Sequence, residues 1–100
     1  MAKATYRILW RPIAAADLNH IIDYIAQDSP DKAAAFGQAL RDKTLPLAQH
    51  PKLGRLGRPG LPAYVRELVV HPNYIVFYRV LTKTKTIEIL SLKHATQKTP

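Results

Sequence analysis

Apolar and polar residues alternate at the start of the chain. Over residues 4–10 the larger apolar side chains fall on one face of an extended segment, at Tyr6, Ile8 and Trp10. Such alternation is typical of a β-strand with one buried face. We therefore expect the first element to be a strand. Pro12 follows it, and proline suits the first turn of a helix.

A helical period replaces this alternation over residues 13–27. Apolar side chains there recur three and four residues apart, at Leu18, Ile21, Ile22 and Ile25. This spacing places them along one face of a helix. Because the polar residues fall mostly elsewhere, the pattern predicts a helix that packs on a core by one face.

A second helix is predicted directly after the first. Ser29 is a favourable cap, Pro30 a favourable first residue, and Asp31 an acid for the positive end of the helix dipole. The apolar stripe of this helix consists of Ala33, Phe36 and Leu40, with Leu47 two turns further on. Pro46 predicts a bend or an early end. Because only about two or three residues join the two helices, we expect them to form an antiparallel hairpin.

The second half of the chain is predicted to be a loop followed by three strands. Residues 50–63 contain three glycines and three prolines, which indicates a loop. Strand signals follow over residues 64–70, 74–81 and 86–92, and the short breaks between them predict an antiparallel meander. The polar residues 93–100 are expected to leave the sheet.

These elements predict an α+β fold with the order β-α-α-β-β-β. The N-terminal helical hairpin is expected to pack on one face of a mainly antiparallel four-stranded sheet. The chain has 100 residues, of which 47% are hydrophobic, so we expect a single domain over residues 1–100 with its own core.

Composition excludes several classes of protein. There are no cysteines, so neither a disulfide nor a thiolate metal site is available. No apolar run approaches the roughly 18 residues of a membrane span, and the start of the chain has no secretory-signal pattern. We expect a soluble cytoplasmic protein that does not contact a membrane.

The positive charge is concentrated in one half of the chain. The formal net charge is +8. Residues 1–42 carry as many acidic as basic side chains, whereas residues 43–100 carry ten basic side chains against Glu67 and Glu88. Such asymmetry indicates an anionic partner, either nucleic acid or an acidic protein. A basic surface without a specific ligand is the alternative.

A few residues are candidates for chemistry or binding. Arg66 and Arg79 lie on predicted strands among apolar neighbours, and His94 could act as an acid or base near neutral pH. Arg55 and Arg58 lie in the glycine-rich loop, where they could bind phosphate or carboxylate groups. Each of these side chains could instead be structural or simply solvated.

Other chemistries find no support in the sequence. His20, His50 and His71 have no metal-ligand spacing, so neither a metal site nor another cofactor is expected. There is no nucleophile–histidine arrangement of a hydrolase. A plain DNA- or RNA-binding module is disfavoured, because no recognition helix or aromatic–basic motif is present.

The order of elements and several local motifs together resemble the RelE/ParE toxin superfamily of bacterial type II toxin–antitoxin systems. The motifs are "HPKLGRLG" in the loop, and "VRELVV", "YIVFYRV" and "IEILSLKHATQ" in the predicted strands and tail. The similarity spans residues 4–97. It implies a small basic toxin that a cognate antitoxin neutralises by direct binding.

The superfamily contains two activities. The RelE-like branch cleaves messenger RNA on the ribosome, whereas the ParE-like branch poisons DNA gyrase. RNA cleavage without a metal requires several converging basic groups and an acid–base residue. Arg66 matches a basic position of the ribonuclease branch. Leu68 and Ile75, however, stand where that branch can carry a lysine and an arginine. The sequence is therefore more similar to the ParE-like branch, and RelE-like ribosome-dependent cleavage remains the alternative.

The resemblance also implies roles for individual residues. A gyrase poison would have no catalytic residues, and Arg55, Arg58, Arg66, Lys93 and His94 are the expected target-binding residues. A ribonuclease would use Arg66, Arg79 and His94. Arg79 is expected to be mainly structural, because Phe77 and Leu81 share its face. Arg66 is expected to reach a partner, so that its loss would remove toxicity without unfolding the protein.

Overall fold

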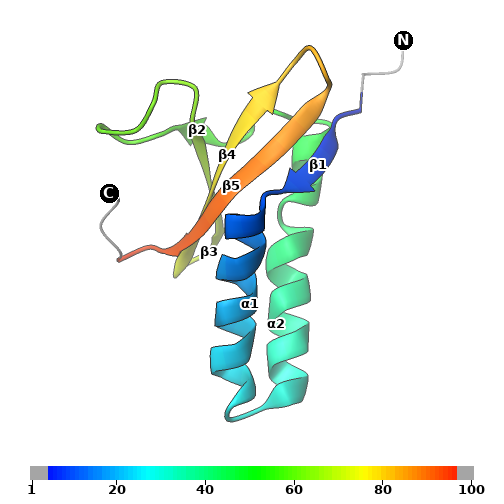
Figure 1. The fold of residues 1–100 in the computed structure, drawn as a ribbon, viewed down its shortest axis with the longest axis vertical. Helices are drawn as coiled ribbons and strands as arrows, with labels where there is room; N and C mark the ends of the chain where they lie inside the picture. Colours follow the sequence, from blue (N-terminus) through cyan, green and yellow to red (C-terminus); the bar gives the residue numbers. More distant parts are fainter. Residues whose placement is uncertain (1–4, 97–100) are drawn as a thin grey trace.

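The structure, a computed structural model, describes residues 5–96 and is shown in Figure 1. The elements follow one another in the order β1 (Arg7–Trp10), α1 (Pro12–Ala26), α2 (Pro30–Asp42), the 3₁₀ helix η1 (Leu45–Ala48), β2 (Arg55–Leu56), β3 (Arg66–His71), β4 (Tyr74–Leu81) and β5 (Thr86–His94). The fold is α+β, as predicted. Residues 4 and 97–100, which the predicted first strand and tail include, lie outside the described part of the chain.

Within residues 5–96, five strands form one mixed sheet in the order β1-β5-β4-β3-β2. β1 is parallel to β5, and the other neighbours are antiparallel. The prediction of four strands was wrong because β2 lies inside the segment predicted to be a loop. There Arg55 pairs with Glu67 and Leu56 with Arg66. A two-residue strand between glycines has too little period to be recognised in a sequence.

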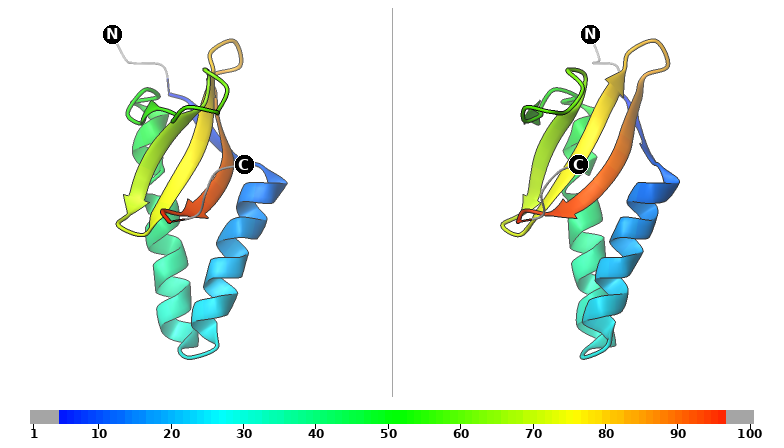
Figure 2. Two further views of the ribbon diagram at one scale, coloured as in Figure 1. Left: turned by 90° about the vertical axis from the view of Figure 1, so that its left-hand side faces the viewer. Right: turned by 60° about the vertical axis from the view of Figure 1, so that its left-hand side comes forward.

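The two helices form the predicted antiparallel hairpin. Both pack on the same side of the sheet, and their far ends extend beyond it (Figure 2). Pro30 begins α2, and Ser29 occupies the N-cap position with an extended backbone, although its side chain makes no capping hydrogen bond. α2 ends at Asp42 and Pro46 lies in η1, which confirms the predicted early end.

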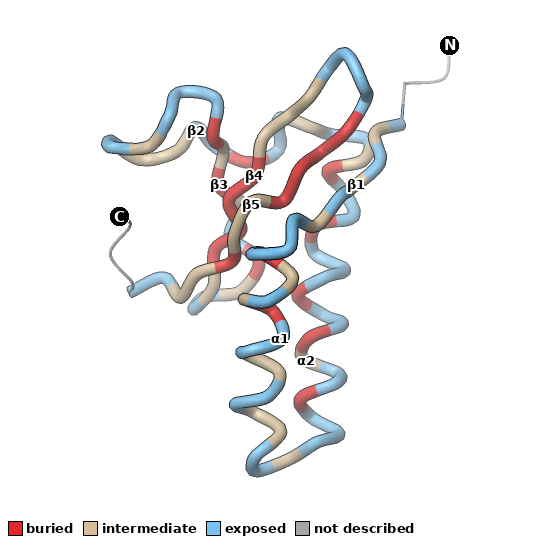
Figure 3. Tube along the Cα trace, viewed as in Figure 1, coloured by how far each residue is buried: buried red, intermediate tan, exposed pale blue. Residues whose placement is uncertain are grey.

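The main core lies between the helices and the sheet, where the buried segments of Figure 3 meet. Its largest fully buried apolar side chains are Leu18, Leu40, Leu47, Val76, Tyr78, Ile87 and Ile89. Tyr6, Ile8 and Trp10 pack against this core from β1, as their alternation predicted. The side of the sheet that bears the helices is called the helix side below, and the opposite side is called the open face.

A bulge changes which residues of β5 face the core. Tyr78 pairs with Ile89 but Phe77 pairs with Ser91, so Leu90 is the extra residue on β5. Ile89 faces the core before the bulge and Leu92 faces it afterwards. β5 also continues to His94, so Lys93 and His94 belong to the sheet and not to a tail, which corrects the prediction for these two residues.

Candidate functional site

The open face carries a second, smaller group of buried apolar residues. Val65, Ile75 and Phe77 pack together there, with Leu61 and Leu90 partly buried against them. Alternation along the strands sends these side chains away from the helices. Two carboxylates that are almost fully buried, Glu67 and Glu88, point to the same face and lie beside this apolar group.

Glu67 holds two arginines of the segment that precedes β3. Nε of Arg55 donates to Oε1 at 2.6 Å, and Nε of Arg58 donates to Oε2 at 3.2 Å. The side chain of Glu67 is 2% exposed, whereas those of Arg55 and Arg58 are 71% and 32% exposed. Both oxygens of one buried carboxylate therefore fix the two arginines of the glycine-rich loop at the edge of the open face.

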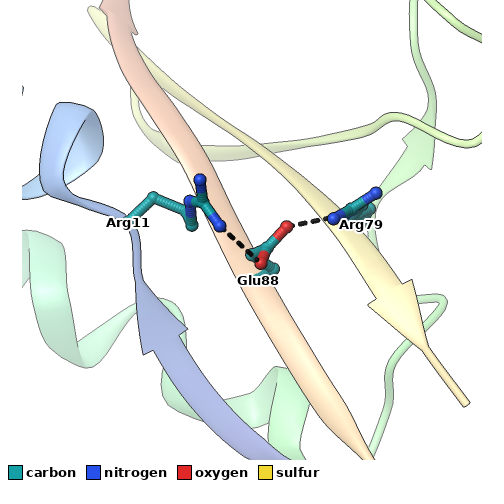
Figure 4. Close-up of polar contacts among 3 residues, drawn as sticks. All are labelled: Arg11, Arg79 and Glu88. Carbon is teal, nitrogen blue, oxygen red and sulfur yellow. Dashed lines mark hydrogen bonds and ion pairs between the residues drawn. The ribbon is translucent and has the colours of Figure 1, made fainter. Parts of the chain in front are cut away.

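Glu88 forms a matching cluster with two other arginines (Figure 4). Nε of Arg79, on β4, donates to Oε1 at 2.6 Å, and Nη1 of Arg11, which follows β1, donates to Oε2 at 3.2 Å. Three separate elements meet in this cluster. Each cluster joins two guanidinium groups to one carboxylate and therefore keeps a net positive charge.

The arginines dominate the titration of these two carboxyl groups. Burial raises the pKa of Glu67, but the hydrogen bonds and charges of Arg55 and Arg58 outweigh burial and lower it below its ordinary value. Burial likewise raises the pKa of Glu88, and Arg79 and Arg11 lower it further than burial raises it. Both carboxylates are therefore ionised at neutral pH and keep holding their arginines.

Aromatic rings support one arginine of each cluster. The guanidinium carbon of Arg58 lies 5.7 Å from the ring centre of Phe77, and that of Arg79 lies 5.6 Å from the ring centre of Tyr64. A guanidinium held between a carboxylate and a ring loses little further freedom when it binds a ligand. These two groups are thus arranged in advance for an anionic partner.

Two grooves lie between and beside the clusters. One, of about 510 Å³, is lined by Arg11, Pro12, Ile13, Tyr64, Arg79, Glu88 and Leu90. The other, of about 290 Å³, is lined by Ile13, Leu61, Val65, Phe77, Leu90, Ser91 and Lys93. Because Ile13 and Leu90 line both, the grooves adjoin along these two side chains.

Arg66 lies on the other side of the sheet. It pairs with Tyr78 across the strands, and its Nη1 donates to the carbonyl oxygen of Gly54 at 2.7 Å. The Tyr78 hydroxyl donates to the carbonyl oxygen of Pro51 at 2.8 Å and accepts a hydrogen bond from the Gly54 amide at 2.8 Å. We call these four residues the Gly54 clamp; it fastens the loop before β2 to the sheet.

The clamp leaves no room for a side chain at Gly54. A Cβ atom there would lie 2.6 Å from the carbonyl oxygen of Glu67 and 2.8 Å from the Tyr78 hydroxyl. Burial raises the pKa of Tyr78, although the Gly54 amide and the charge of Arg66 oppose the rise. The phenol therefore remains protonated at neutral pH and can donate to Pro51.

Lys93 and His94 lie at the other end of the sheet. Lys93 pairs with Ile75 on the open face, and its Nζ lies 3.5 Å from Oδ1 of Asp17 on α1. His94 is on the helix side. Its Nδ1 is 2.7 Å from the Thr96 hydroxyl, and its ring centre is 5.3 Å from that of Tyr74.

The three residues expected in a ribonuclease site do not converge. Arg79 is on the open face, whereas Arg66 and His94 are on the helix side. Arg66 and His94 are opposite Tyr78 and Tyr74 respectively, which places them about 13 Å apart along the strands. Of the five expected target-binding residues, the open face brings together Arg55, Arg58 and Lys93.

Sequence reasoning missed the two glutamates that organise the open face, together with Arg11 and Tyr64. A signal was present, because Glu67 and Glu88 are the only acidic residues after residue 42 and both fall within strand patterns. An isolated acid among apolar strand residues indicates a paired carboxylate. The pair of partners that Glu88 has could not be identified, since Arg11 and Arg79 are far apart in the sequence.

Residues 5–96 offer neither a metal site nor a membrane-spanning helix. No group of three or more histidine, cysteine, aspartate or glutamate side chains in this range could hold a metal ion. None of the helices in the same range is long and apolar enough to cross a bilayer.

Comparisons with known proteins find toxins of toxin–antitoxin systems. A family model described as the ParE toxin of the type II toxin–antitoxin system parDE matches residues 8–99. Toxin RelE2 of Caulobacter vibrioides is 42% identical over 91 residues, which cover 89% of this chain and 94% of that protein.

Solved structures of two toxin–antitoxin systems have similar folds. The chromosomal ParDE system of P. aeruginosa contains a chain that matches with a TM-score of 0.75 and 31% identity, over 92% of this chain and 98% of that one. The RelBE2 complex of Mycobacterium tuberculosis contains a chain that matches with a TM-score of 0.65 and 19% identity, over 96% and 98% of the two chains. The second likeness concerns the fold alone.

Proposed function

Because the chain belongs to the ParE toxin family of type II toxin–antitoxin systems, we propose that it poisons DNA gyrase and is neutralised by a cognate antitoxin. In this role the protein does no covalent chemistry. It binds gyrase and holds the cleaved DNA intermediate open, so that DNA breaks accumulate.

The separation of Arg66, Arg79 and His94 is the observation that carries this proposal. A metal-free ribonuclease must deprotonate the 2′-hydroxyl, stabilise the phosphate charge and protonate the leaving oxygen at one place. Here Arg79 is bonded to Glu88 on the open face, and Arg66 is bonded to Gly54 on the helix side. Side chains on opposite faces of a sheet cannot act on the same phosphate.

Leu68 and Ile75, which stand where the ribonuclease branch can carry cations, support the same proposal. Ile75 is 7% exposed and packs with Val65 and Phe77 on the open face. Leu68 packs against the main core on the helix side. Both side chains contribute to packing, and neither offers charge to a phosphate.

RelE-like ribosome-dependent cleavage of messenger RNA is the second candidate. It is favoured by one observation, the 42% identity to a protein named toxin RelE2. In that case Arg66, Arg79 and His94 would need a large rearrangement on the ribosome to meet at one phosphate.

The proposed antitoxin contact lies along α1. A groove of about 500 Å³ between α1 and the end of β5 is lined by Asp17, His20, Ile21, Tyr24, Tyr74, Leu92, Lys93, His94 and Thr96. Tyr24 is 74% exposed, and Ile21 beside it is half-buried. An amphipathic helix of the antitoxin could place apolar side chains here. Strand addition at Leu92 is less favourable, since Asp17 Oδ2 already accepts a hydrogen bond from the Leu92 amide.

The open face is the proposed contact with the target. Arg55, Arg58 and Lys93 lie there, and we assign them to direct contact with gyrase. Arg66 is given a positioning role, because it holds the loop that carries Arg55 and Arg58. His94 lies on the helix side beside the α1 groove, so it is not included in the target contact.

Regulated expression without antitoxin tests the proposal in cells. We expect DNA breaks and loss of plasmid supercoiling to appear before protein synthesis falls. Pulse labelling of new protein and plasmid topology are measured in the same culture, with toxin and antitoxin expressed together as the control. An early stop in translation with normal plasmid topology would favour the ribonuclease alternative.

A further inference from the structure

We propose that the open face binds a segment of the target protein and not the phosphate backbone of DNA. In that segment, acidic side chains flank a group of apolar side chains. This inference rests on the proposed function, since it names the part of the gyrase–DNA complex that the toxin recognises. It follows from the kind of surface that lies between the two arginine clusters.

Large apolar side chains are exposed on the open face. Ile13, at the start of α1, is 66% exposed and lies where the two grooves adjoin. Tyr64 is 59% exposed in one groove, and Leu9 and Val69, which pair with Glu88 and Ile75, are 47% and 58% exposed. Aromatic side chains and arginine are the residues that protein–protein interfaces favour.

The charge of the open face is better suited to a few carboxylates than to a phosphate chain. Each cluster has two guanidinium groups, and its one carboxylate neutralises half of their positive charge. Lys93 is likewise beside Asp17. A protein that binds the DNA backbone gains affinity from cations that displace counterions. The carboxylate in each cluster halves the positive charge available for that purpose, and the charge that remains is enough to attract an acidic side chain.

The two clusters lie on the open face beside the apolar grooves, and they are carried by different strands. Glu67 is on β3 and Glu88 is on β5, with Phe77 and Leu90 between them. A partner segment that places apolar side chains over Ile13 and Leu90 would bring flanking acidic side chains to Arg58 and Arg79. These two arginines are already held by a ring and a carboxylate, so their ordering costs little on binding.

The test compares Ile13→Asp with a matched control, Leu45→Asp. Leu45 is similarly exposed, at 57%, but lies in η1 away from the grooves. An aspartate at the second position of α1 is favourable to the helix dipole, so Ile13→Asp should fold normally. Antitoxin binding by both variants checks this directly.

Affinity is measured separately for purified gyrase protein without DNA, for gyrase with bound DNA, and for a DNA duplex alone. We expect the parent toxin to bind gyrase protein without DNA. Ile13→Asp should weaken this binding by about tenfold or more, and Leu45→Asp by less than about twofold. The inference is overturned if Ile13→Asp still binds the antitoxin, and is therefore folded, yet binds gyrase protein as tightly as the parent does. It is also overturned if the parent binds the DNA duplex as tightly as gyrase protein. If the parent binds gyrase neither with nor without DNA, the proposed function itself fails.

Discussion

Arg66 and Arg79 lie on opposite faces of the same sheet. Arg66, on β3, donates to the carbonyl oxygen of Gly54 beside Tyr78. Arg79, the residue after Tyr78 on β4, donates to Glu88 on β5. The two arginines looked alike in the sequence, as single cations on neighbouring strands. In the fold, one of them fastens a loop to the core side and the other completes a charged cluster on the open face.

The Gly54 clamp should be a large contributor to stability through Tyr78. Tyr78→Phe removes the hydroxyl that serves both Gly54 and Pro51, and leaves buried polar groups without that partner. The expected loss in the free energy of unfolding is about 1–3 kcal/mol. Urea denaturation measures it, with the exposed Tyr24→Phe as the control. Equal stability of the two variants would show that the Tyr78 hydroxyl contributes nothing to the stability of the fold.

Arg79 should matter for stability far more than Arg55. Arg79→Ala takes one of two partners from the buried Glu88, and we expect a loss of about 2 kcal/mol after allowing for the partial exposure of Arg79. Arg55 is 71% exposed and Arg58 remains on Glu67, so Arg55→Ala should cost less than about 0.5 kcal/mol. Thermal and urea unfolding check both values. A small loss for Arg79→Ala would contradict a structural role.

Stability should decrease in acid because of the two clusters. The pKa values of Glu67 and Glu88 are lower in the folded protein than their ordinary value of 4.5, so their stabilisation is complete above that pH. It is lost as the pH falls through the lower, folded pKa values. We expect the stability difference between the parent and Glu88→Gln to shrink below about pH 4.5. The exposed Asp28→Asn serves as the control, and a difference that stays constant down to pH 3 would be contrary to this account.

Association with the antitoxin should depend on salt. The formal net charge of +8 predicts that the antitoxin has an acidic segment. Long-range electrostatic attraction between the two proteins should then speed their association. Stopped-flow measurements should show an association rate that falls clearly as ionic strength rises, while the dissociation rate changes less. A rate that is the same at low and high salt would mean that electrostatic attraction does not guide this encounter.

Much of the fold could be predicted because its signals are local. The periods of both helices, the Ser29-Pro30 start of α2 and the breaks between β3, β4 and β5 can all be read from neighbouring residues. The parallel pairing of β1 with β5 could not be predicted in this way. It joins Arg7 to Thr86 across almost the whole chain.

The candidate site could be predicted less well, because it depends on which face of the sheet each residue occupies. The bulge at Leu90 shifts the alternation of β5, so that Leu92 and not Ser91 faces the core. Arg66 was expected to reach a partner, but the structure gives it a hydrogen bond to Gly54, which no sequence pattern indicates. Arg55 and Arg58 were expected to bind phosphate or carboxylate groups from the glycine-rich loop, and the structure bonds both of them to Glu67, a shared carboxylate that no local sequence pattern indicates.

The most direct test of the central claim compares the two possible targets with one preparation of toxin. Purified toxin is added to gyrase with plasmid DNA, and to ribosomes translating a defined messenger. We predict inhibited supercoiling and trapped cleaved plasmid in the first assay, with intact messenger in the second. Addition of the antitoxin should reverse the first effect. Cleavage of ribosome-bound messenger, with gyrase unaffected at the same toxin concentration, would contradict the account.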